Sequence, residues 1–248
     1  MNKIVCFYWE GERWQETTGG PLPSDISFVR HLNRVGPVSK ELVTKYINNL
    51  YQGVKKFTTV PFEFICFTNE FLPGLSSEIK TKHFFKVTNK GVLPRMYMFS
   101  RDAGLTGSQV LSLDLDIIIT GSLDDLLKYN GPFCTRMSWT RGEENLIDGD
   151  IMSFRANDTM EELFWKPLAA APHLIEASTG GRERLWVRHV MKGLPVDTWQ
   201  DIAPGQVCSY KFHVRESGKV PDNTRIVSCH GYPRPHQIEE EWRMDFWK

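Results

Sequence analysis

The sequence predicts an α/β fold in which a mostly parallel central sheet is flanked by helices. Continuous apolar runs of strand length occur at residues 3–9, 62–68 and 109–114. Such runs are typical of a parallel sheet that is covered on both faces, whereas a half-exposed strand alternates apolar and polar residues. Between the first two runs, residues 40–57 carry apolar side chains at helical spacing. Strands that alternate with helices favour an α/β domain.

The first 130 residues hold the more regular part of this pattern. The helix over 40–57 has apolar side chains one turn apart, at Leu42, Val43, Tyr46, Ile47 and Leu50. We also expect a loop at 16–25, a third strand at 83–87, and a helix at 95–104 that stops at a glycine. "QVLSLD" (109–114) then predicts a strand buried on both faces.

Beyond Gly131 the pattern is looser. A strand is predicted at 148–154, helices at 158–169 and 182–193, and a strand-like segment at 225–235. "SYKFHV" (209–214) also indicates a strand, along which Lys211 and His213 would alternate in surface or packing roles. No internal repeat or linker interrupts the chain, so we expect a single domain over 1–248.

Composition sets broad limits on function. The 248 residues contain 30 Lys plus Arg and 30 Asp plus Glu, so overall charge gives no argument for a nucleic-acid partner or an acidic membrane surface. No apolar run is long enough to span a bilayer, and the N-terminus indicates a first strand rather than a signal peptide. Five widely spaced cysteines without a CxxC motif indicate reduced thiols in a cytoplasmic protein and argue against a cysteine-rich zinc site.

Two aspartates interrupt the apolar run "VLSLDLDIII". In an extended chain Asp114 and Asp116 project to the same side, and two close carboxylates repel each other. A divalent cation removes this repulsion, and ligands of parallel sheets gather at the carboxyl ends of strands. The alternative is a D-x-D without function. Next, Ser122 and Asp125 have the spacing of a capping box, so Asp124 and Asp125 are interpreted as charges at a helix start.

The segment "QVLSLDLDIIITGSLDDLL" resembles the D-x-D segment of GT-A fold glycosyltransferases, specifically glycogenin and related bacterial galactosyltransferases. "HGYPRP" resembles their C-terminal motif, and "KIVCFYW", "FEFICFTN" and "IDGDIMSF" resemble, in order, two strands of the nucleotide-binding half and the strand that lines the sugar site. The resemblance covers most of the chain. It implies one GT-A domain with a nucleotide-binding half (1–130) and a sugar and acceptor half (131–248), whose tail closes the metal site.

The resemblance also implies a metal site and phosphate contacts. Asp114, Asp116 and His230 would hold Mn²⁺ or Mg²⁺, with Asp114 also facing the diphosphate of a UDP-sugar. Arg95 and Arg234 would contact the donor phosphates. The chain departs from the family pattern at three points: His230 directly precedes Gly231, arginine stands where the family has lysine, and His236 replaces a tryptophan.

Four further residues are candidates for the donor and catalytic sites. Tyr8 and Trp9 end the first predicted strand, where an aromatic ring would stack on uracil; core packing is the alternative. Asp148 is a candidate for a contact with sugar hydroxyls. Glu183 stands where relatives carry a glutamine of an Asp-Gln pair. Asp148 and Glu183 are also the candidates for a general base.

These features predict a metal-dependent glycosyltransferase that moves a sugar from a UDP-sugar to a hydroxyl of a glycan, lipid or protein. A glycan- or nucleotide-binding module that has lost catalysis is the first alternative. A sugar-nucleotide nucleotidyltransferase is the second, but the glycines of "EGERWQETTGG" are more scattered than its phosphate-binding loop requires. No nucleic-acid partner is expected.

Overall fold

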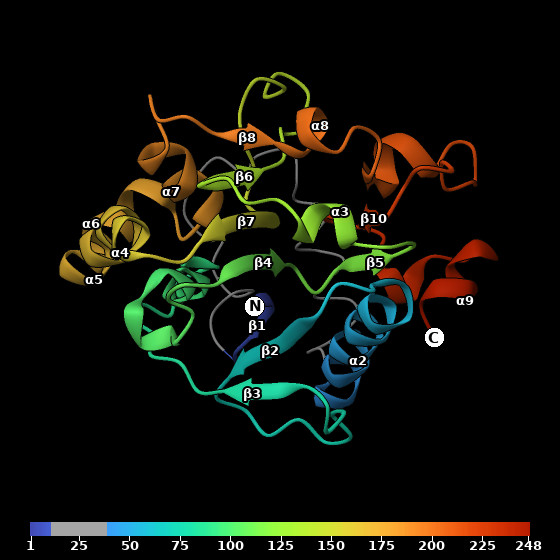
Figure 1. Ribbon diagram of the computed structural model, residues 1–248, viewed down its shortest axis with the longest axis horizontal. Helices are drawn as coiled ribbons and strands as arrows, with labels where there is room; N and C mark the ends of the chain where they lie inside the picture. The colour runs from blue at the N-terminus through green and yellow to red at the C-terminus, as the bar shows by residue number, and fades with distance from the viewer. Residues whose placement is uncertain (11–38) are drawn as a thin grey trace.

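The computed structural model describes residues 1–10 and 39–248, so the loop predicted at 16–25 lies outside the described residues. Its main feature is a seven-stranded sheet in that part of the chain, with the order β3-β2-β1-β4-β7-β6-β8 (Figure 1). The strands are β1 (Asn2–Tyr8), β2 (Phe62–Thr68), β3 (Lys80–Lys82), β4 (Gln109–Leu113), β6 (Phe133–Thr135), β7 (Ile151–Arg155) and β8 (Asp197–Thr198).

The predicted mostly parallel sheet is confirmed. β1 pairs in parallel with β2 and β4, β2 with β3, and β6 with β8, whereas β7 runs antiparallel to both of its neighbours. A second, three-stranded sheet joins β5 (Ile117–Ile119) and β9 (Val207–Ser209) to the central β10 (Ile226–Ser228). Because β5 directly follows the two aspartates, this small sheet brings the C-terminal part of the chain to the end of β4.

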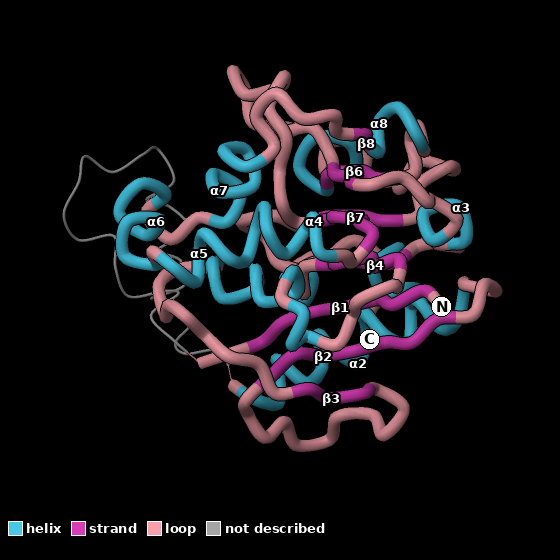
Figure 2. Tube along the Cα trace, turned by 60° about the vertical axis from the view of Figure 1, so that its left-hand side comes forward, coloured by secondary structure: helices cyan, strands magenta, loops and turns pink. Residues whose placement is uncertain are grey.

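Helices cover both faces of the large sheet (Figures 1 and 2). On one side lies α2 (Lys40–Phe57), which begins where the Ser39 hydroxyl caps the amide of Leu42 (3.2 Å). The other side is covered by η2 (Leu93–Phe99), α4 (Asp158–Met160), η4 (Glu161–Trp165), α5 (Lys166–Ala170), α6 (Pro172–Thr179) and α7 (Glu183–Val190). The remaining helices are η3 (Arg101–Ala103), α3 (Asp124–Leu127), α8 (Trp199–Ile202), η5 (Tyr210–Val214), η6 (Pro235–Gln237) and α9 (Trp242–Phe246).

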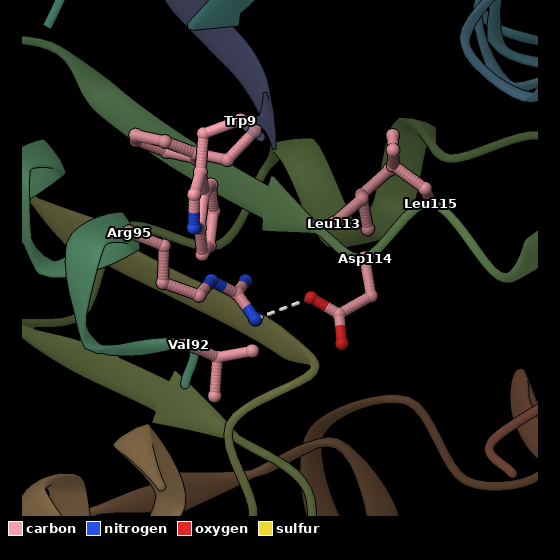
Figure 3. Close-up of a pocket in the computed structure, with 7 residues that line it drawn as sticks. Trp9, Val92, Arg95, Leu113, Asp114 and Leu115 are labelled. Atoms are coloured by element: carbon pink, nitrogen blue, oxygen red, sulfur yellow. Dashed lines mark hydrogen bonds and ion pairs between the residues drawn. The ribbon is translucent and has the colours of Figure 1, made fainter. Parts of the chain in front are cut away.

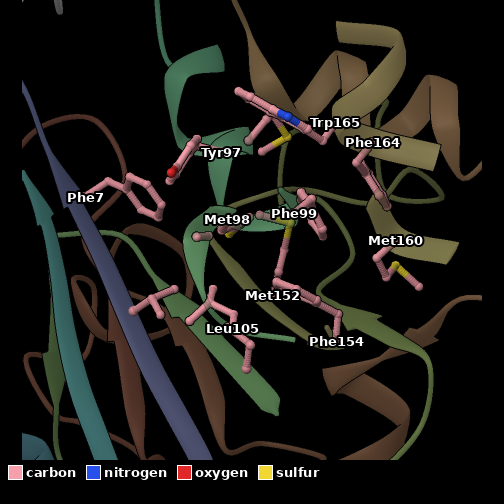
Figure 4. Close-up of a cluster of buried hydrophobic side chains, with 14 of the residues drawn as sticks. Phe7, Tyr97, Met98, Phe99, Leu105, Met152, Phe154, Met160, Phe164 and Trp165 are labelled. Carbon is pink, nitrogen blue, oxygen red and sulfur yellow. The ribbon is translucent and has the colours of Figure 1, made fainter. Parts of the chain in front are cut away.

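The core around the large sheet has two layers because successive side chains of a strand point to opposite faces, and a third cluster packs around the small sheet. On β1, Ile4 and Cys6 pack toward α2, whereas Val5 and Phe7 join the layer beneath η2 and α7. Figure 4 shows this second layer, in which the rings of Phe99 and Phe164 stack with their centroids 4.1 Å apart. The alternation matters for function because it decides which side chains reach the carboxyl end of the sheet on each face.

Several predicted elements differ from the observed ones. The third strand lies at Lys80–Lys82 rather than at 83–87, and residues 95–104 form two 3₁₀ segments rather than one α-helix. The strand predicted over 209–214 is wrong beyond Ser209, because Tyr210–Val214 form a π-helical turn. The alternation argued for Lys211 and His213 therefore does not apply.

No helix within residues 1–10 and 39–248 has both the length and the apolar composition needed to cross a membrane.

Candidate active site

The two aspartates lie just beyond the carboxyl end of β4, a strand near the middle of the large sheet. Ser112 and Asp114 continue the alternation of β4 toward the face that η2 covers, and both side chains contact Arg95 of η2. The chain then turns at Leu115 and Asp116 before β5. The prediction that both carboxylates project from one extended strand is therefore wrong in its geometry, since a turn rather than strand alternation sets the direction of Asp116.

Arg95 is the cation on the β4 side of the site. Its side chain is buried, donates to Ser112 Oγ (2.8 Å) and forms an ion pair with Asp114. Its Nη1 also lies 3.6 Å from Glu183 Oε1 at the start of α7. Figure 3 shows the guanidinium of Arg95 directed at the carboxylate of Asp114, with the indole of Trp9 close by.

A pocket opens at this point. It is lined by Phe7, Trp9, Val92, Arg95, Leu113, Asp114 and Leu115. Phe7 and Trp9 share a face of the first strand and its extension, whereas Tyr8 packs against the opposite core layer, on the α2 side. The structure thus brings Trp9 to the pocket but not Tyr8. Sequence reasoning missed Phe7, which the period of two along a strand would have paired with Trp9.

Two glycines bring Glu183 to Arg95. The amide of Val92, at the start of η2, donates to the carbonyl of Gly181 (2.8 Å), just before α7. A Cβ on Gly91 would lie 2.1 Å from that same carbonyl oxygen, and Gly91 has a φ of 59°. Only glycine permits both this approach and this conformation. The contact fixes the start of α7 beside η2, so that Glu183 and Arg95 meet.

The C-terminal tail folds back onto the two aspartates. β10 runs antiparallel to β5, and the amide of Cys229 donates to the carbonyl of Asp116 (2.9 Å). Arg234, further along the tail, forms an ion pair with the carboxylate of Asp116. Each aspartate of the D-x-D motif therefore faces its own arginine, one from η2 and one from the tail.

His230 lies in this tail but is held by other partners. Its Nε2 lies 2.8 Å from Ser209 Oγ, and its ring stacks on Trp139 with the centroids 5.5 Å apart. Burial and the nearby Arg136 guanidinium lower the pKa of His230 to about 4, so its imidazole is neutral at pH 7. Among residues 1–10 and 39–248, no three His, Cys, Asp or Glu side chains form a group that would hold a metal ion.

A buried arginine joins the remaining carboxylates. Arg136, which follows β6, is 3% exposed and pairs with Asp148 (Nη2–Oδ2 3.2 Å) and with Asp150 (Nε–Oδ1 2.6 Å). Asp150 Oδ2 accepts from Ser228 Oγ of the tail (2.8 Å), and its carbonyl accepts from the amide of Asp114 (3.0 Å). Burial favours neutral Asp150, but Arg136 and Ser228 outweigh it and lower its pKa.

Asp150 therefore contacts three parts of the site: the D-x-D turn, the segment that follows β6, and the tail. Sequence reasoning missed both Arg136 and Asp150 as residues of the site. A signal for Arg136 did exist, because it is a lone charge in the buried run "FCTRMSW". The candidate Asp148 lies beside this cluster. The side chain of the candidate Glu183 packs over Gly149, where a Cβ built on Gly149 would lie 3.4 Å from Glu183 Cγ.

The structure thus brings Arg95 together with Asp114 and Glu183 beside Trp9, and Arg234 together with Asp116. It does not bring Tyr8 to the pocket, and it holds His230 against Ser209 and Trp139 rather than at the two aspartates.

No family model and no curated protein sequence matches the chain. Solved structures do. The galactosyltransferase LgtC, in complex with donor and acceptor sugar analogues, matches 98% of this chain and 93% of its own with a TM-score of 0.63 and 10% identity. An active-site mutant of LgtC matches 96% and 91% with a TM-score of 0.62 and 10% identity. The chain has the GT-A glycosyltransferase fold.

The glycosyltransferase GlyE of Streptococcus pneumoniae TIGR4 shares this GT-A fold. It matches all of the chain with a TM-score of 0.58 and 11% identity, but the chain spans only 60% of GlyE. At 10–11% identity the likeness concerns the fold, so the role of each residue rests on the contacts described above. The GT-A fold inferred from the D-x-D segment and the tail is confirmed.

Proposed function

We propose that the protein is a metal-dependent glycosyltransferase that transfers a sugar from a nucleotide-diphosphate donor, a UDP-sugar, to a hydroxyl group. The observation that carries the proposal is the end of β4 in this GT-A fold. There Asp114 and Asp116 each face an arginine beside a pocket edged by Trp9. The structure of LgtC with donor and acceptor sugar analogues supports the same class of reaction for this chain.

The donor would occupy the pocket with its base toward Phe7 and Trp9. Aromatic side chains present an apolar face that suits a nucleobase. Arg95 and Arg234 would hold the diphosphate, since a guanidinium binds phosphate oxygens through two parallel hydrogen bonds. Both arginines already face carboxylates here, and the same hydrogen-bonding groups serve phosphate.

The two aspartates of the D-x-D motif suit a divalent ion. The carboxylates of Asp114 and Asp116 are hard oxygen donors, and both lie at a turn where a guanidinium balances each charge. His230 is the proposed third ligand, because its neutral imidazole is one residue from Cys229, whose amide binds Asp116. To serve, it would have to leave Ser209. Bound Mn²⁺ or Mg²⁺ would neutralise charge on the leaving diphosphate.

Asp148 and Glu183 are the proposed catalytic residues. Glu183 lies beside Arg95, on the donor side, and Asp148 lies beside Arg136. Each carboxylate, held by its arginine, would accept a hydrogen bond from a sugar hydroxyl. One of them would act as the general base if the acceptor hydroxyl is deprotonated during the reaction.

The test is calorimetry of UDP-galactose, UDP-glucose and GDP-mannose binding, with Mn²⁺ and with a chelator. We expect wild-type binding to require the metal, because two carboxylates would otherwise repel the anionic diphosphate. Asp116→Asn should remove the effect of Mn²⁺. Arg234→Ala should weaken donor binding by about 10- to 100-fold, as expected for a lost charge-assisted contact, while Mn²⁺ binding stays largely intact.

Asp125→Asn is the matched control. Asp125 is exposed on α3 and pairs with Lys128 at 3.7 Å, so donor binding should not change. Equal donor affinity with Mn²⁺ and with chelator would contradict the proposed metal dependence of donor binding. Donor binding without any release of nucleotide, with every acceptor tried, would favour the binding module that has lost catalysis.

A further inference from the structure

Three lysines gather on the face of the large sheet that η2 covers, away from the two aspartates. Lys3 of β1 is the register partner of Glu63 on the neighbouring β2, and Lys80 and Lys82 lie two residues apart on β3, so their side chains point to one face. The carboxylate of Glu63 pairs with Lys80 (Oε1–Nζ 2.5 Å) and with Lys3 (Oε2–Nζ 3.6 Å). We define Lys3, Lys80 and Lys82 as the lysine cluster.

Two ammonium groups of the lysine cluster meet at the turn that ends η3. Lys82 donates to the carbonyl oxygens of Ala103 (2.9 Å) and Gly104 (3.5 Å), and Lys3 donates to the same oxygen of Gly104 (2.9 Å). Lys82 alone reaches both carbonyl oxygens. Hydrogen bonding to the turn therefore does not explain why a second ammonium group is brought to the same place.

The charges of the lysine cluster do not balance. Three ammonium groups share one carboxylate, and in the described part of the chain no second carboxylate forms an ion pair with any of them. Lys3 is only 15% exposed and Glu63 20%, whereas Lys80 is 57% exposed and leaves the cluster open to solvent. Partial burial and the charges of Lys3 and Lys80 lower the pKa of Lys82, although Glu63 opposes them. An anion bound here would relieve this repulsion.

The kind of anion follows from the donors and from the excess of two positive charges. An ammonium group is a compact charge with three hydrogen-bond donors, which suits a tetrahedral anion with several oxygens, whereas a flat carboxylate suits the fork of a guanidinium. A phosphate monoester carries about two negative charges at neutral pH. We propose that the lysine cluster is a binding site for a phosphate group, either free phosphate or the monoester end of a larger molecule.

This site is separate from the pocket proposed for the donor. Lys3 is at the amino end of β1, whereas Phe7 and Trp9 line the donor pocket at the carboxyl end. Four to six residues of extended chain span about 13–20 Å. The proposal therefore does not depend on the glycosyltransferase function.

The experiment is calorimetry of inorganic phosphate binding at constant ionic strength, with a chelator present. We expect the wild type to bind phosphate, and Lys3→Met and Lys82→Met each to weaken binding about tenfold, because each removes a charge-assisted contact. Lys80→Met, at an exposed position where the fold should not suffer, should weaken it in the same direction. Glu63→Gln should instead tighten phosphate about threefold, because it releases two lysines from an ion pair.

The matched control is Lys55→Met, which removes the same charge from an exposed lysine that pairs with Glu78 (2.6 Å) and should leave phosphate affinity unchanged. Cosedimentation with phosphatidylcholine vesicles, with and without phosphatidic acid, distinguishes the sources. Binding to the vesicles that contain phosphatidic acid would identify a lipid headgroup, and binding of free phosphate alone would identify a soluble ligand.

UDP affinity should be the same in wild type, Lys3→Met and Lys82→Met. If the wild type does not bind phosphate, or if all three Lys→Met variants of the cluster bind it as tightly as the wild type, the phosphate site is wrong. If Lys3→Met or Lys82→Met weakens UDP and phosphate alike, the cluster is not a separate site. A wild type that binds phosphate but no UDP would count against the proposed function and leave the phosphate site standing.

Discussion

At the scale of single residues, the site is a set of carboxylates that arginines separate. Arg95 lies between Asp114 and Glu183, and Arg136 lies between Asp148 and Asp150. A buried carboxylate without a partner costs several kcal/mol, so such a density of acids is possible only with this interleaving. The arginines are therefore structural as well as functional, and removing one leaves two acids uncompensated.

Arg136 gives the sharpest stability prediction. Burial opposes the charge of its guanidinium, but Asp150 and Asp148 outweigh burial and raise its pKa. Arg136→Ala should lower the free energy of unfolding by about 3–5 kcal/mol, the cost of breaking a buried ion pair. Arg136→Lys should recover part of the lost free energy of unfolding. Urea unfolding, followed by tryptophan fluorescence, measures the free energy of unfolding. The control is Arg155→Ala at an exposed position, which should lower the free energy of unfolding by less than about 0.5 kcal/mol.

Asp114 and Asp116 were predictable from the sequence, and a lone charge in an apolar run also marked Arg136, whereas Asp150 was not predictable. Two acids inside an apolar run conflict with their local context, and that conflict is visible without a structure. Asp150 follows a glycine in a polar stretch, where solvation is the simplest interpretation. Its role arises only when Ser228, 78 residues further along the chain, reaches its side chain. No local pattern encodes such a contact.

At the scale of elements, the start of α3 shows how tertiary contacts override a local motif. Ser122 and Asp125 have the spacing of a capping box, but the observed helix is only Asp124–Leu127. Its N-cap residue is Leu123, which offers no capping side chain, and Ser122 Oγ accepts from the amide of Asp124 (3.1 Å). Asp124 instead reaches the loop before β2, accepting hydrogen bonds from the amides of Thr59 (2.8 Å) and Val60 (3.0 Å). Asp124 thus connects the start of α3 to the loop before β2, in addition to being a charge at the start of one helix.

This link should be sensitive to pH. Burial favours protonated Asp124, but the hydrogen bonds from Thr59 and Val60 outweigh it and lower its pKa to about 2. A lowered folded-state pKa contributes stability that is complete above the unfolded value and is lost as the pH falls toward the folded value. Asp124→Asn should therefore cost about 1–2 kcal/mol at pH 7 and progressively less below pH 4, as measured by urea unfolding across that range. A pH-independent difference would contradict the ionic contact.

Other elements differ from prediction for related reasons. The apolar run at 83–87 reads as a strand, yet the edge of the sheet is formed by Lys80–Lys82, because parallel pairing with Ile65, Cys66 and Phe67 sets the register. Phe84 leaves the sheet and packs into the core beside Phe7 and Trp9. Long strands such as β1 and β2 were predictable because burial on both faces makes most of their sequence apolar.

At the scale of the whole molecule, the D-x-D turn is where the large sheet meets the small one. Asp114 is bonded through its amide to Asp150 at the start of β7, and Asp116 is bonded through its carbonyl to Cys229 after β10. The parallel strands β1, β2 and β4 follow from the apolar runs and the helical pattern of the sequence. The antiparallel β7 and the return of the tail to β5 depend on contacts between segments 38–46 and 107–111 residues apart, which the sequence alone does not specify.

The side chain of Asp150 couples these two sheets, because it binds both Arg136 after β6 and Ser228 of β10. Asp150→Asn preserves volume but removes the ion pair, so the fold should remain while the tail opens more often. We expect backbone amides of residues 226–229 to exchange hydrogen about tenfold faster, which corresponds to about 1.4 kcal/mol in local opening, while the amides of β1 keep their protection. Hydrogen exchange with mass spectrometry measures both regions.

Asp158→Asn is the control, since Asp158 pairs with Arg101 on the surface and both side chains are mostly exposed. If Asp150→Asn leaves the tail as protected as in the wild type, the backbone pairing of β10 with β5 and β9 holds the tail without help from Asp150.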